Sequence, residues 1–183
     1  MRLQSLREEV LEANLELVRR GLVIDTFGNA SGISREDGLV VIKPSGVAYD
    51  KMRPADMVVT DMTGRTIEGA LRPSSDLPTH LALYRAFAAI GGVAHTHSRN
   101  ATAWAQAGRP IPCLGTTHAD YFHGSIPVTA FLDPAEIKTD YELNTGHAIV
   151  RTLEGLDGKD PLAMPAVLVA GHNRKSTRLN SSH

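Results

Sequence analysis

The amino-acid sequence predicts a single domain of mixed α/β type, and three observations carry this prediction. Apolar residues recur at helical spacing over residues 3–20, which indicates an amphipathic helix. Short apolar runs rich in β-branched residues, as at 39–42 and 57–60, are bounded by Gly, Pro and Asp and are typical of strands. The 183 residues contain no internal repeat and no Ser/Gly linker, so we expect one core.

The first half of the chain predicts one helix followed by β structure. The helix over residues 3–20 ends at Gly21, a typical C-cap. A short strand at 22–24 leads into residues 26–32, whose small side chains indicate a tight turn or a close approach of backbone. The other expected elements are a hairpin of residues 33–34 and 38–42, a turn at 43–46, a hairpin of residues 57–60 and 65–68, and a polar loop at 73–76.

The second half predicts alternating helices and strands. A helix over 78–90 precedes a strand over 91–97. The remaining expected elements are a helix at 100–107 with Trp104 buried, a polar loop at 115–120, helices at 135–138 and 139–153 with Gly146 interrupting the second, and a buried strand at 166–170.

The composition is that of an ordinary soluble protein, and we expect it in the cytoplasm. Hydrophobic residues make up 42%, charged residues 21%, and the formal net charge is −1. This balance argues against a nucleic-acid partner and against a membrane partner recruited by bulk charge. No apolar run approaches the roughly 18 residues that span a bilayer, and the charged N-terminal residues lack a signal-peptide core. A single Cys113 excludes an internal disulfide and a four-thiolate zinc site.

Two histidines at the end of the predicted 91–97 strand are the first candidate functional residues. His95 and His97 have i, i+2 spacing, so on one strand both side chains point to the same face. Neutral imidazole is the commonest protein ligand for zinc. The same spacing also fits a polar surface pair or a hydrogen-bonded core pair, so the pattern alone leaves the function of the pair open.

A third histidine and an aspartate extend this candidate site. His172 follows the predicted strand at 166–170, and three histidines with one open position form the ligand set of a catalytic zinc. His172 also fits an ordinary loop residue. Asp76 is a candidate fourth ligand that substrate displaces, and it competes with a role as N-cap of the helix near Pro78.

Three turns are candidate phosphate-binding loops, and a carboxylate is a candidate general base. Each turn offers small residues, backbone N–H groups and hydroxyls, although each also fits an ordinary turn. None is a P-loop or a dinucleotide fingerprint. Asp120 lies in a polar run where it can move a proton of a bound carbonyl substrate, or serve as a turn or capping residue. The loop candidates are Gly28, Asn29, Lys43, Ser45, Gly46, Ser74 and Ser75.

Seven runs together resemble one enzyme family over about residues 1–172. They are EAN at 12–14, GNAS at 28–31, VIKPSGV at 41–47, PSSD at 73–76, HTHS at 95–98, WAQAG at 104–108 and GTTHADYF at 115–122. Their nearly constant spacing resembles the L-ribulose-5-phosphate 4-epimerases of the class II aldolase/adducin head superfamily. The run at 115–122 favours the epimerases over fuculose- and rhamnulose-phosphate aldolases, which usually carry Glu at the position of Asp76.

The resemblance implies a three-layer α/β fold, with a central and largely antiparallel sheet between helices, in a C4 homotetramer with active sites at subunit interfaces. It implies Zn²⁺ as the cofactor, bound by His95, His97 and His172 with Asp76 also at the metal. It implies that Gly28, Asn29, Ser45, Gly46, Ser74 and Ser75 hold a sugar phosphate, and that Asp120 is an acid/base. Neither nucleic acid nor a membrane is an expected partner.

The implied reaction interconverts L-ribulose 5-phosphate and D-xylulose 5-phosphate in pentose catabolism, of the arabinose or ascorbate type. The C3–C4 bond breaks by a retro-aldol step, with zinc as Lewis acid, and re-forms with C4 inverted. Two other readings stay open. One is a metal-dependent class II sugar-phosphate aldolase, and the other is a non-catalytic adducin-like assembly domain, which typically lacks the histidines.

The last residues depart from the family pattern. Residues 1–172 resemble the class II aldolase/adducin N-terminal-type domain, incomplete at its C-terminus, whereas residues 173–183 have no apolar periodicity and resemble an adapter read-through. We expect a non-native tail there. The resemblance also implies further helices and a catalytic Tyr that have no counterpart in this sequence, so we expect the chain as written to be insoluble or inactive and the full gene product to be an epimerase.

Overall fold

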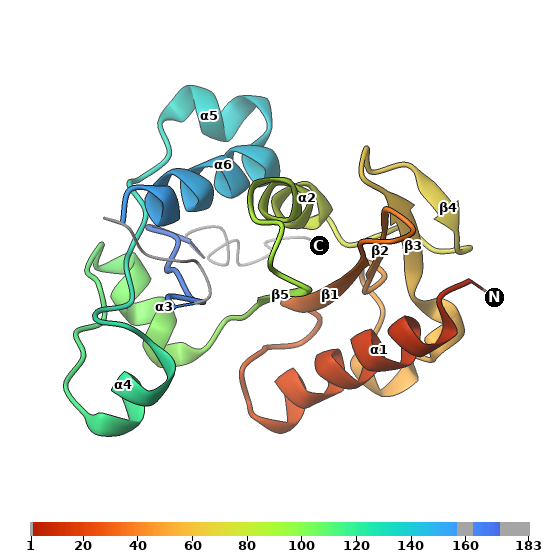
Figure 1. The fold of residues 1–183 in the computed structure, drawn as a ribbon, viewed down its shortest axis with the longest axis horizontal. Coiled ribbons are helices and arrows are strands. Elements are labelled where there is room, and N and C mark those ends of the chain that lie inside the picture. Colours follow the sequence, from red (N-terminus) through yellow and green to blue (C-terminus); the bar gives the residue numbers. More distant parts are fainter. Residues whose placement is uncertain (1, 157–162, 173–183) are drawn as a thin grey trace, which may run out of the picture. The chain divides into compact units, whose positions relative to one another are not determined.

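The computed structural model describes residues 2–156 and 163–172, and the chain divides into two compact units, Met1–Ser98 and Arg99–His183 (Figure 1). The predicted tail at 173–183 lies outside the described residues. In the part of the chain that is described, no helix is long and apolar enough to cross a membrane.

The first unit is built around a five-stranded sheet with the order β4-β3-β2-β1-β5, in which every pairing is antiparallel. Both predicted hairpins are present as β1–β2 and β3–β4. The predicted strand at 91–97 is shorter, because its partner β1 begins opposite His95. The strands are β1 (Asn29–Ser34), β2 (Leu39–Ile42), β3 (Val58–Asp61), β4 (Thr66–Glu68) and β5 (Gly92–His95), with 3₁₀ turns at Tyr49–Lys51 and Pro54–Asp56.

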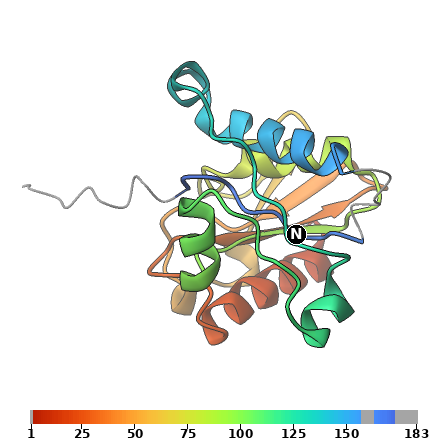
Figure 2. The ribbon, with the colours of Figure 1, turned by 90° about the vertical axis from the view of Figure 1, so that its left-hand side faces the viewer.

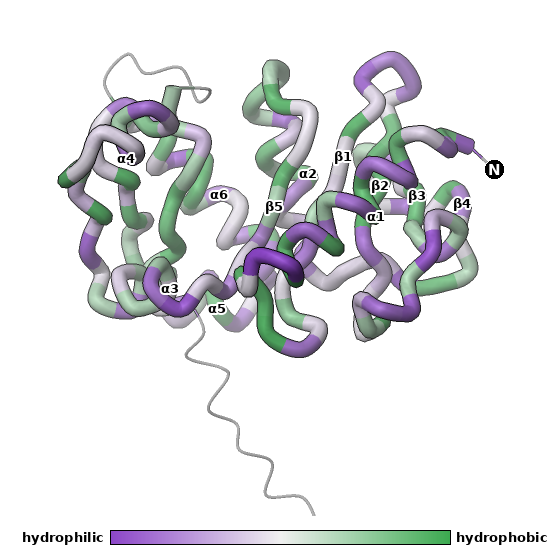
Figure 3. Tube along the Cα trace, turned by 90° about the horizontal axis from the view of Figure 1, so that it is seen from below, coloured by the Kyte–Doolittle hydropathy of each residue, from purple (hydrophilic) through white to green (hydrophobic). Residues whose placement is uncertain are grey.

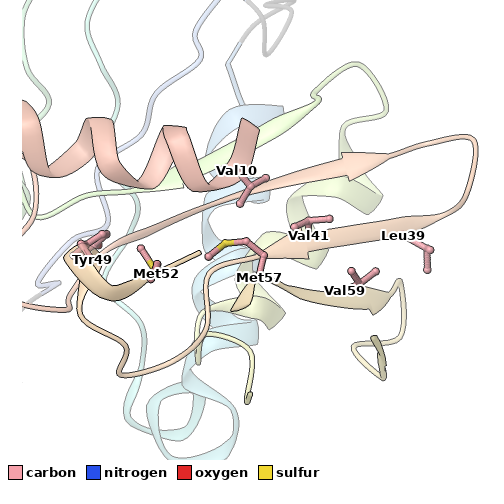
Figure 4. Packing of buried hydrophobic residues seen from close by; sticks show 7 residues of the cluster. All are labelled: Val10, Leu39, Val41, Tyr49, Met52, Met57 and Val59. Carbon is pink, nitrogen blue, oxygen red and sulfur yellow. The ribbon is translucent and has the colours of Figure 1, made fainter. Parts of the chain in front are cut away.

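Helices cover both faces of this sheet, as Figure 2 shows for α1 (Gln4–Arg19) and α2 (Leu77–Ala86). Alternate residues of the strands face opposite helices, since side chains on a strand alternate in direction. Val41 and Val59 pack with Val10 of α1, and Figure 4 shows Val10 directed toward Val41. The opposite face packs against α2 through Val40, Ile42, Val58, Leu77, Leu81 and Tyr84. The predicted three-layer arrangement, with an antiparallel sheet between helices, is confirmed.

The first helix lies unusually close to β1, and the sequence of that strand explains why. A Cβ atom built on Gly32 would lie 2.8 Å from Leu6 and 3.1 Å from Val10, so a larger residue would have to displace these side chains of the helix. Asn14, fully buried on α1, donates to the carbonyl of Ala30 at 3.0 Å and accepts from its N–H at 2.8 Å. The helix therefore fixes the strand beside Asn29.

The predicted strand at 22–24 is wrong. The chain instead closes a tight turn in which the N–H of Phe27 donates to the carbonyl of Ile24 at 2.9 Å, and Asp25 adopts a φ of 51°. Ile24 and Phe27 are consequently 60% and 58% exposed, because neither is part of a sheet that could bury it. The expected close approach at 26–32 is real, and it continues into β1.

Among its described residues, the second unit contains four helices and extended segments around its own apolar cluster. The helices are α3 (Arg99–Gln106), α4 (Thr116–Tyr121), α5 (Pro134–Thr139) and α6 (Tyr141–Glu154). The cluster centres on Ala105, Ile126, Met164 and Leu168. Trp104 packs against it but is only half-buried, and α6 runs through Gly146 without the predicted interruption.

Two predictions for this unit need correction. The run at 115–120 forms helix α4 and not a loop; none of its residues is buried, so its polar sequence carries no core-facing stripe. The expected strand at 166–170 is reduced to one parallel bridge between Leu168 and Val128. Helix α1, by contrast, was predicted from its sequence. Figure 3 shows hydrophilic and hydrophobic residues alternating along this helix.

Candidate metal and anion site

The register of the sheet brings three polar residues of the first unit together. His95 is the last residue of β5 and pairs with Asn29, the first residue of β1. Asp76 precedes α2 and reaches both, since its Oδ2 accepts from Nδ2 of Asn29 at 2.6 Å and lies 2.6 Å from Nδ1 of His95. A strand start, a strand end and a helix start thus meet at one carboxylate.

Asp76 occupies the N-cap position of α2 but its side chain does not cap the helix. Of its two predicted roles, capping is therefore the one that the geometry does not support. Burial alone would raise the pKa of Asp76. The hydrogen bonds from His95 and Asn29 and the charge of His95 together outweigh burial, so the pKa of Asp76 lies below its usual value. The carboxylate is ionised at neutral pH and accepts the Nδ1 proton of His95.

His97 lies beyond β5, and a separate contact holds it. Its backbone N–H donates to the carbonyl of Leu22 at 2.8 Å, and its ring stacks on Phe27 with centroids 6.1 Å apart. Burial lowers the pKa of His97 to about 4, and the neighbouring His95 adds to the shift, so the ring is neutral at pH 7. Because β5 ends at His95, the position of His97 depends on its hydrogen bond to Leu22 as well as on the alternation of side chains along the strand.

The donor atoms of the two histidines lie close to the spacing expected for two ligands of one metal ion. Nε2 of His95 and Nε2 of His97 are 3.1 Å apart. Two Zn–N bonds of about 2.0–2.1 Å at a tetrahedral angle place their nitrogens about 3.3 Å apart. Because the N–H at Nδ1 of His95 donates a hydrogen bond to Asp76, the Nε2 of that ring presents a lone pair. The donor set of this unit therefore fits a zinc ion.

The predicted anion loops of the first unit converge beside this site. Pro44 and Pro73 form a bridge, the N–H of Ser74 donates to the carbonyl of Lys43 at 3.0 Å, and the N–H of Ser45 donates to Arg72 at 2.9 Å. Ser45, Gly46 and Ser75 are exposed, and Gly46 has a φ of 70°. Two of the three loops are thus joined along their backbones.

Lys43 links these loops to the third one. Its Nζ donates to the carbonyls of Thr26 at 3.4 Å and Pro44 at 3.3 Å, and lies 4.8 Å from the ring centroid of Tyr49. Tyr49 donates to the carbonyl of Gly28 at 2.7 Å. Burial lowers the pKa of Lys43, while the charge of Asp76 opposes the shift. Lys43 is a buried cation with long, weak hydrogen bonds, suited to a stronger anionic partner.

Gly28 is required where the loop before β1 passes close to the backbone of His95. Its φ is 93°, and an added Cβ would lie 2.9 Å from the carbonyl oxygen of His95 and 2.5 Å from Val23. A side chain here would displace β5 at His95, so this glycine serves the histidine pair as well as the anion loop.

A buried polar network beneath the site was missed by sequence reasoning. Ser31 Oγ lies 2.7 Å from Nδ1 of His80 and 2.8 Å from the hydroxyl of Tyr84. Burial lowers the pKa of His80 to about 4 and raises that of Tyr84 to about 12, so both are neutral at pH 7. Only the polar interruptions in the apolar stripe of α2 signal this network in the sequence.

The second unit carries the other two predicted site residues, on separate elements. His172 is half-buried and follows Gly171, and its Nδ1 lies 3.0 Å from the hydroxyl of Tyr141. Asp120 is exposed on α4. Tyr141 was not singled out from the sequence, which has no local pattern linking residues 31 positions apart.

Comparisons with known proteins agree with this fold. An L-fuculose 1-phosphate aldolase is 28% identical, with a TM-score of 0.74 over 92% of this chain and 72% of that chain. The Klebsiella pneumoniae YgbL, a putative aldolase/epimerase/decarboxylase, is 25% identical, with a TM-score of 0.66 over 94% and 77%. The L-fuculose-1-phosphate aldolase of Thermus thermophilus, 23% identical with a TM-score of 0.67 over 94% and 78%, shares the fold.

The sequence itself matches one family over most of its length. Residues 8–173 match the family described as Class II Aldolase and Adducin N-terminal domain. The match includes β1–β5, both anion loops that are joined through their backbones, and all three predicted histidine ligands. The chain belongs to the class II aldolase and adducin N-terminal domain family.

Proposed function

We propose that this chain is a zinc-dependent, cytoplasmic L-ribulose-5-phosphate 4-epimerase that interconverts L-ribulose 5-phosphate and D-xylulose 5-phosphate. One observation carries the proposal: the Asp76–His95–His97 group lies in the same unit as three loops suited to a phosphate. A metal to polarise a ketose and an anion site to hold its phosphate are the two requirements of sugar-phosphate retro-aldol chemistry.

His95, His97 and His172 would hold the metal, with Asp76 in the same site. Class II aldolases are typically metal-dependent, and three histidines leave an open position for substrate oxygen. Asp76, predicted as a fourth ligand, engages Nδ1 of His95 in this structure. The bound zinc would supply Lewis acidity at the ketose oxygens.

The phosphate would occupy the loops around Lys43. The hydroxyls of Ser45, Ser74 and Ser75 offer hydrogen bonds, and Lys43 offers the charge. Gly28 and Asn29 would contribute from the third loop, where Asn29 donates to Asp76. A phosphorylated substrate anchored here is held by the end that does not react, which leaves the carbon chain to be positioned for cleavage.

The reaction conserves every atom. A base removes the proton of the C4 hydroxyl, the C3–C4 bond breaks, and its electron pair passes to the C2 carbonyl, giving the enediolate of dihydroxyacetone and glycolaldehyde phosphate. The aldehyde turns its other face and the bond re-forms with C4 inverted. We assign Asp120 to one of the proton transfers. Asp120→Asn is then expected to lower kcat strongly while leaving the Kd for substrate unchanged.

A second candidate is a sugar-phosphate aldolase that releases its aldehyde. It is favoured by the 28% identity to an L-fuculose 1-phosphate aldolase. The epimerase is favoured by the run at 115–122 and by Asp76 where those aldolases usually carry Glu. An adducin-like assembly domain is disfavoured, because it typically lacks the histidines that this chain retains.

Binding measurements test the proposal first, because they do not depend on turnover. Calorimetry with the full gene product should show one Zn²⁺ per chain, and zinc-loaded protein should bind L-ribulose 5-phosphate but not L-ribulose. Product analysis then distinguishes the candidates. D-Xylulose 5-phosphate supports the epimerase, free glycolaldehyde phosphate supports the aldolase, and binding that is independent of zinc or phosphate would contradict both.

We also propose a C4 homotetramer, as the family resemblance implies. Light scattering combined with size-exclusion chromatography should give four times the chain mass of 19.7 kDa. A monomer that binds zinc and substrate with full affinity would contradict this part of the proposal.

A further inference from the structure

His172 is held in place by two separate parts of the second unit. Its own segment is tied to residues 127–129, where the N–H of Thr129 donates to the carbonyl of Leu168 at 2.8 Å and the N–H of Ala170 donates to Oγ1 of Thr129 at 3.0 Å. The turn then closes as the N–H of His172 donates to the carbonyl of Val169 at 3.1 Å. The backbone of His172 is therefore fixed.

Tyr141 contacts the imidazole ring of His172. It is the first residue of α6, and its hydroxyl oxygen lies 3.0 Å from Nδ1 of His172. The N-cap Asp140 holds this helix start, since its side chain accepts from the N–H of Leu143 and its carbonyl from Asn144 at 2.9 Å. Asn144 also donates to the carbonyl of Glu136 on α5 at 2.8 Å. A capped helix start is a rigid support for the hydroxyl.

We propose that Tyr141 is a positioning residue for the metal site: its hydroxyl oxygen accepts the Nδ1 proton of His172 and so directs Nε2 of that ring toward the metal. The inference rests on the proposed role of His172 as a ligand. A neutral imidazole carries its proton on one nitrogen only, and the partner of that nitrogen decides which one remains a ligand. Tyr141 therefore selects the tautomer as well as the ring orientation.

The first unit shows the same arrangement with a different acceptor. Nδ1 of His95 donates to the carboxylate of Asp76, which leaves its Nε2 as the donor atom. Outer partners of this kind typically change metal affinity by about 10- to 100-fold. A neutral phenol is a weaker acceptor than a carboxylate, so we expect Tyr141 to act at the lower end of that range. It also adds no charge to the metal site.

Metal affinity in matched variants tests the inference. Tyr141→Phe removes only the hydroxyl, and Tyr121→Phe removes the same group from an exposed tyrosine of the same unit. The full-length variants are titrated with Zn²⁺ against a chromogenic chelator, and with Co²⁺ to record its ligand-field bands. We expect Tyr141→Phe to weaken Zn²⁺ binding about tenfold and to alter the Co²⁺ spectrum, with Tyr121→Phe matching the wild type.

The tautomer of His172 is the readout that a merely structural role would not move. In ¹⁵N-labelled, metal-free protein, His172 should be protonated at Nδ1, and Tyr141→Phe should give a mixture of tautomers. The His172→Ala variant identifies the ¹⁵N signals of His172, because they are missing from its spectrum. It also gives the Zn²⁺ affinity expected when this ligand is lost. Circular dichroism and thermal melting check that each variant is folded.

The outcomes separate this inference from the function on which it rests. If wild-type protein binds zinc and Tyr141→Phe binds it equally well, Tyr141 does not position the ligand, and the proposed function stands. A wild-type His172 protonated at Nε2 would likewise overturn the inference. If His172→Ala binds zinc as tightly as wild type, then His172 is not a ligand, and both proposals fail.

Discussion

Oδ2 of Asp76 accepts the Nδ1 proton of His95 over 2.6 Å, joining a helix start to a strand end 19 residues later in the chain. This pair orients the imidazole before any ligand arrives. Asp76 can be replaced by Asn, which removes the negative charge and keeps the size of the side chain.

Replacing Asp76 by Asn tests this relationship. The amide keeps the volume but loses the charge that holds the Nδ1 proton, so Zn²⁺ affinity should fall about 10- to 100-fold. Chelator competition measures the change. Asp50→Asn, at an exposed position of the same unit, should bind zinc as the wild type does. Unchanged affinity in Asp76→Asn would show that His95 needs no carboxylate.

Lys43→Met should separate phosphate binding from metal binding. The loss of a charge-assisted hydrogen bond costs about 1.5–3 kcal/mol, so affinity for a phosphorylated ligand should fall about 10- to 100-fold. Zinc affinity should not change, and exposed Lys51→Met is the control. Burial lowers the pKa of Lys43, so this side chain loses its charge at a lower pH than an ordinary lysine does. The affinity of the wild type for phosphate should therefore fall as the pH is raised into the alkaline range. A flat alkaline profile would contradict this role.

Asn14→Leu should destabilise the first unit. The substitution leaves the buried N–H and carbonyl of Ala30 without the partner they have on α1. At about 1–3 kcal/mol for each of these two unsatisfied groups, the free energy of unfolding should fall by about 2–6 kcal/mol. Urea denaturation measures it, and exposed Asn100→Leu on α3 should leave it nearly unchanged.

Gly171→Ala should destabilise the segment that carries His172. Gly171 has a φ of 66°, and an added Cβ would lie 2.9 Å from the ring of Phe131. The left-handed conformation alone costs about 1–2 kcal/mol for a residue with a Cβ, so thermal unfolding should shift downward. Gly115→Ala is the matched control, because a Cβ there meets nothing within 4 Å and φ is −149°. Equal melting of the two variants would contradict this explanation.

Asp61 should make stability depend on acid pH. The hydroxyl of Thr63 chiefly, with backbone N–H groups of Thr63 and Arg65, lowers the pKa of Asp61 to about 2. A lowered folded-state pKa stabilises the fold above the ordinary value of 3.8, and this stabilisation is lost as the pH falls toward 2. Urea titrations should therefore show a wild-type advantage over Asp61→Asn at pH 6 that narrows below pH 4. A gap independent of pH would exclude this cause.

The elements that could be predicted from sequence are those whose pattern is local. The helix Gln4–Arg19 and the two hairpins follow from periodicity and turn residues over short windows. Strand β1 was predicted only at its end, because Asn29 to Gly32 are small residues selected by the approach of α1 rather than by strand propensity. Helix α4 was missed because a helix without a buried face has no apolar stripe.

The candidate site was predictable in its residue types but not in its connections. Histidine spacing drew attention to His95 and His97, yet His97 reaches its place through a bond to Leu22 and not through the strand. The competition between capping and the metal site at Asp76 could not be decided without knowing that His95 lies 2.6 Å away. His80 gave only a weak signal, a polar residue within the apolar stripe of α2, because a fully buried histidine looks like a surface one in the sequence.

The position of β5 also affects how this protein is made on the ribosome. Strands β1 to β4 form a meander of neighbours in the chain, so they can assemble as soon as each emerges, whereas β5 must return to the edge beside β1. Loop closure of this length is slower than hairpin formation. The loops at 43–46 and 73–76, with Asp76, are therefore synthesised before His95 and His97, and the Asp76–His95 contact forms only after the other four strands have left the ribosome.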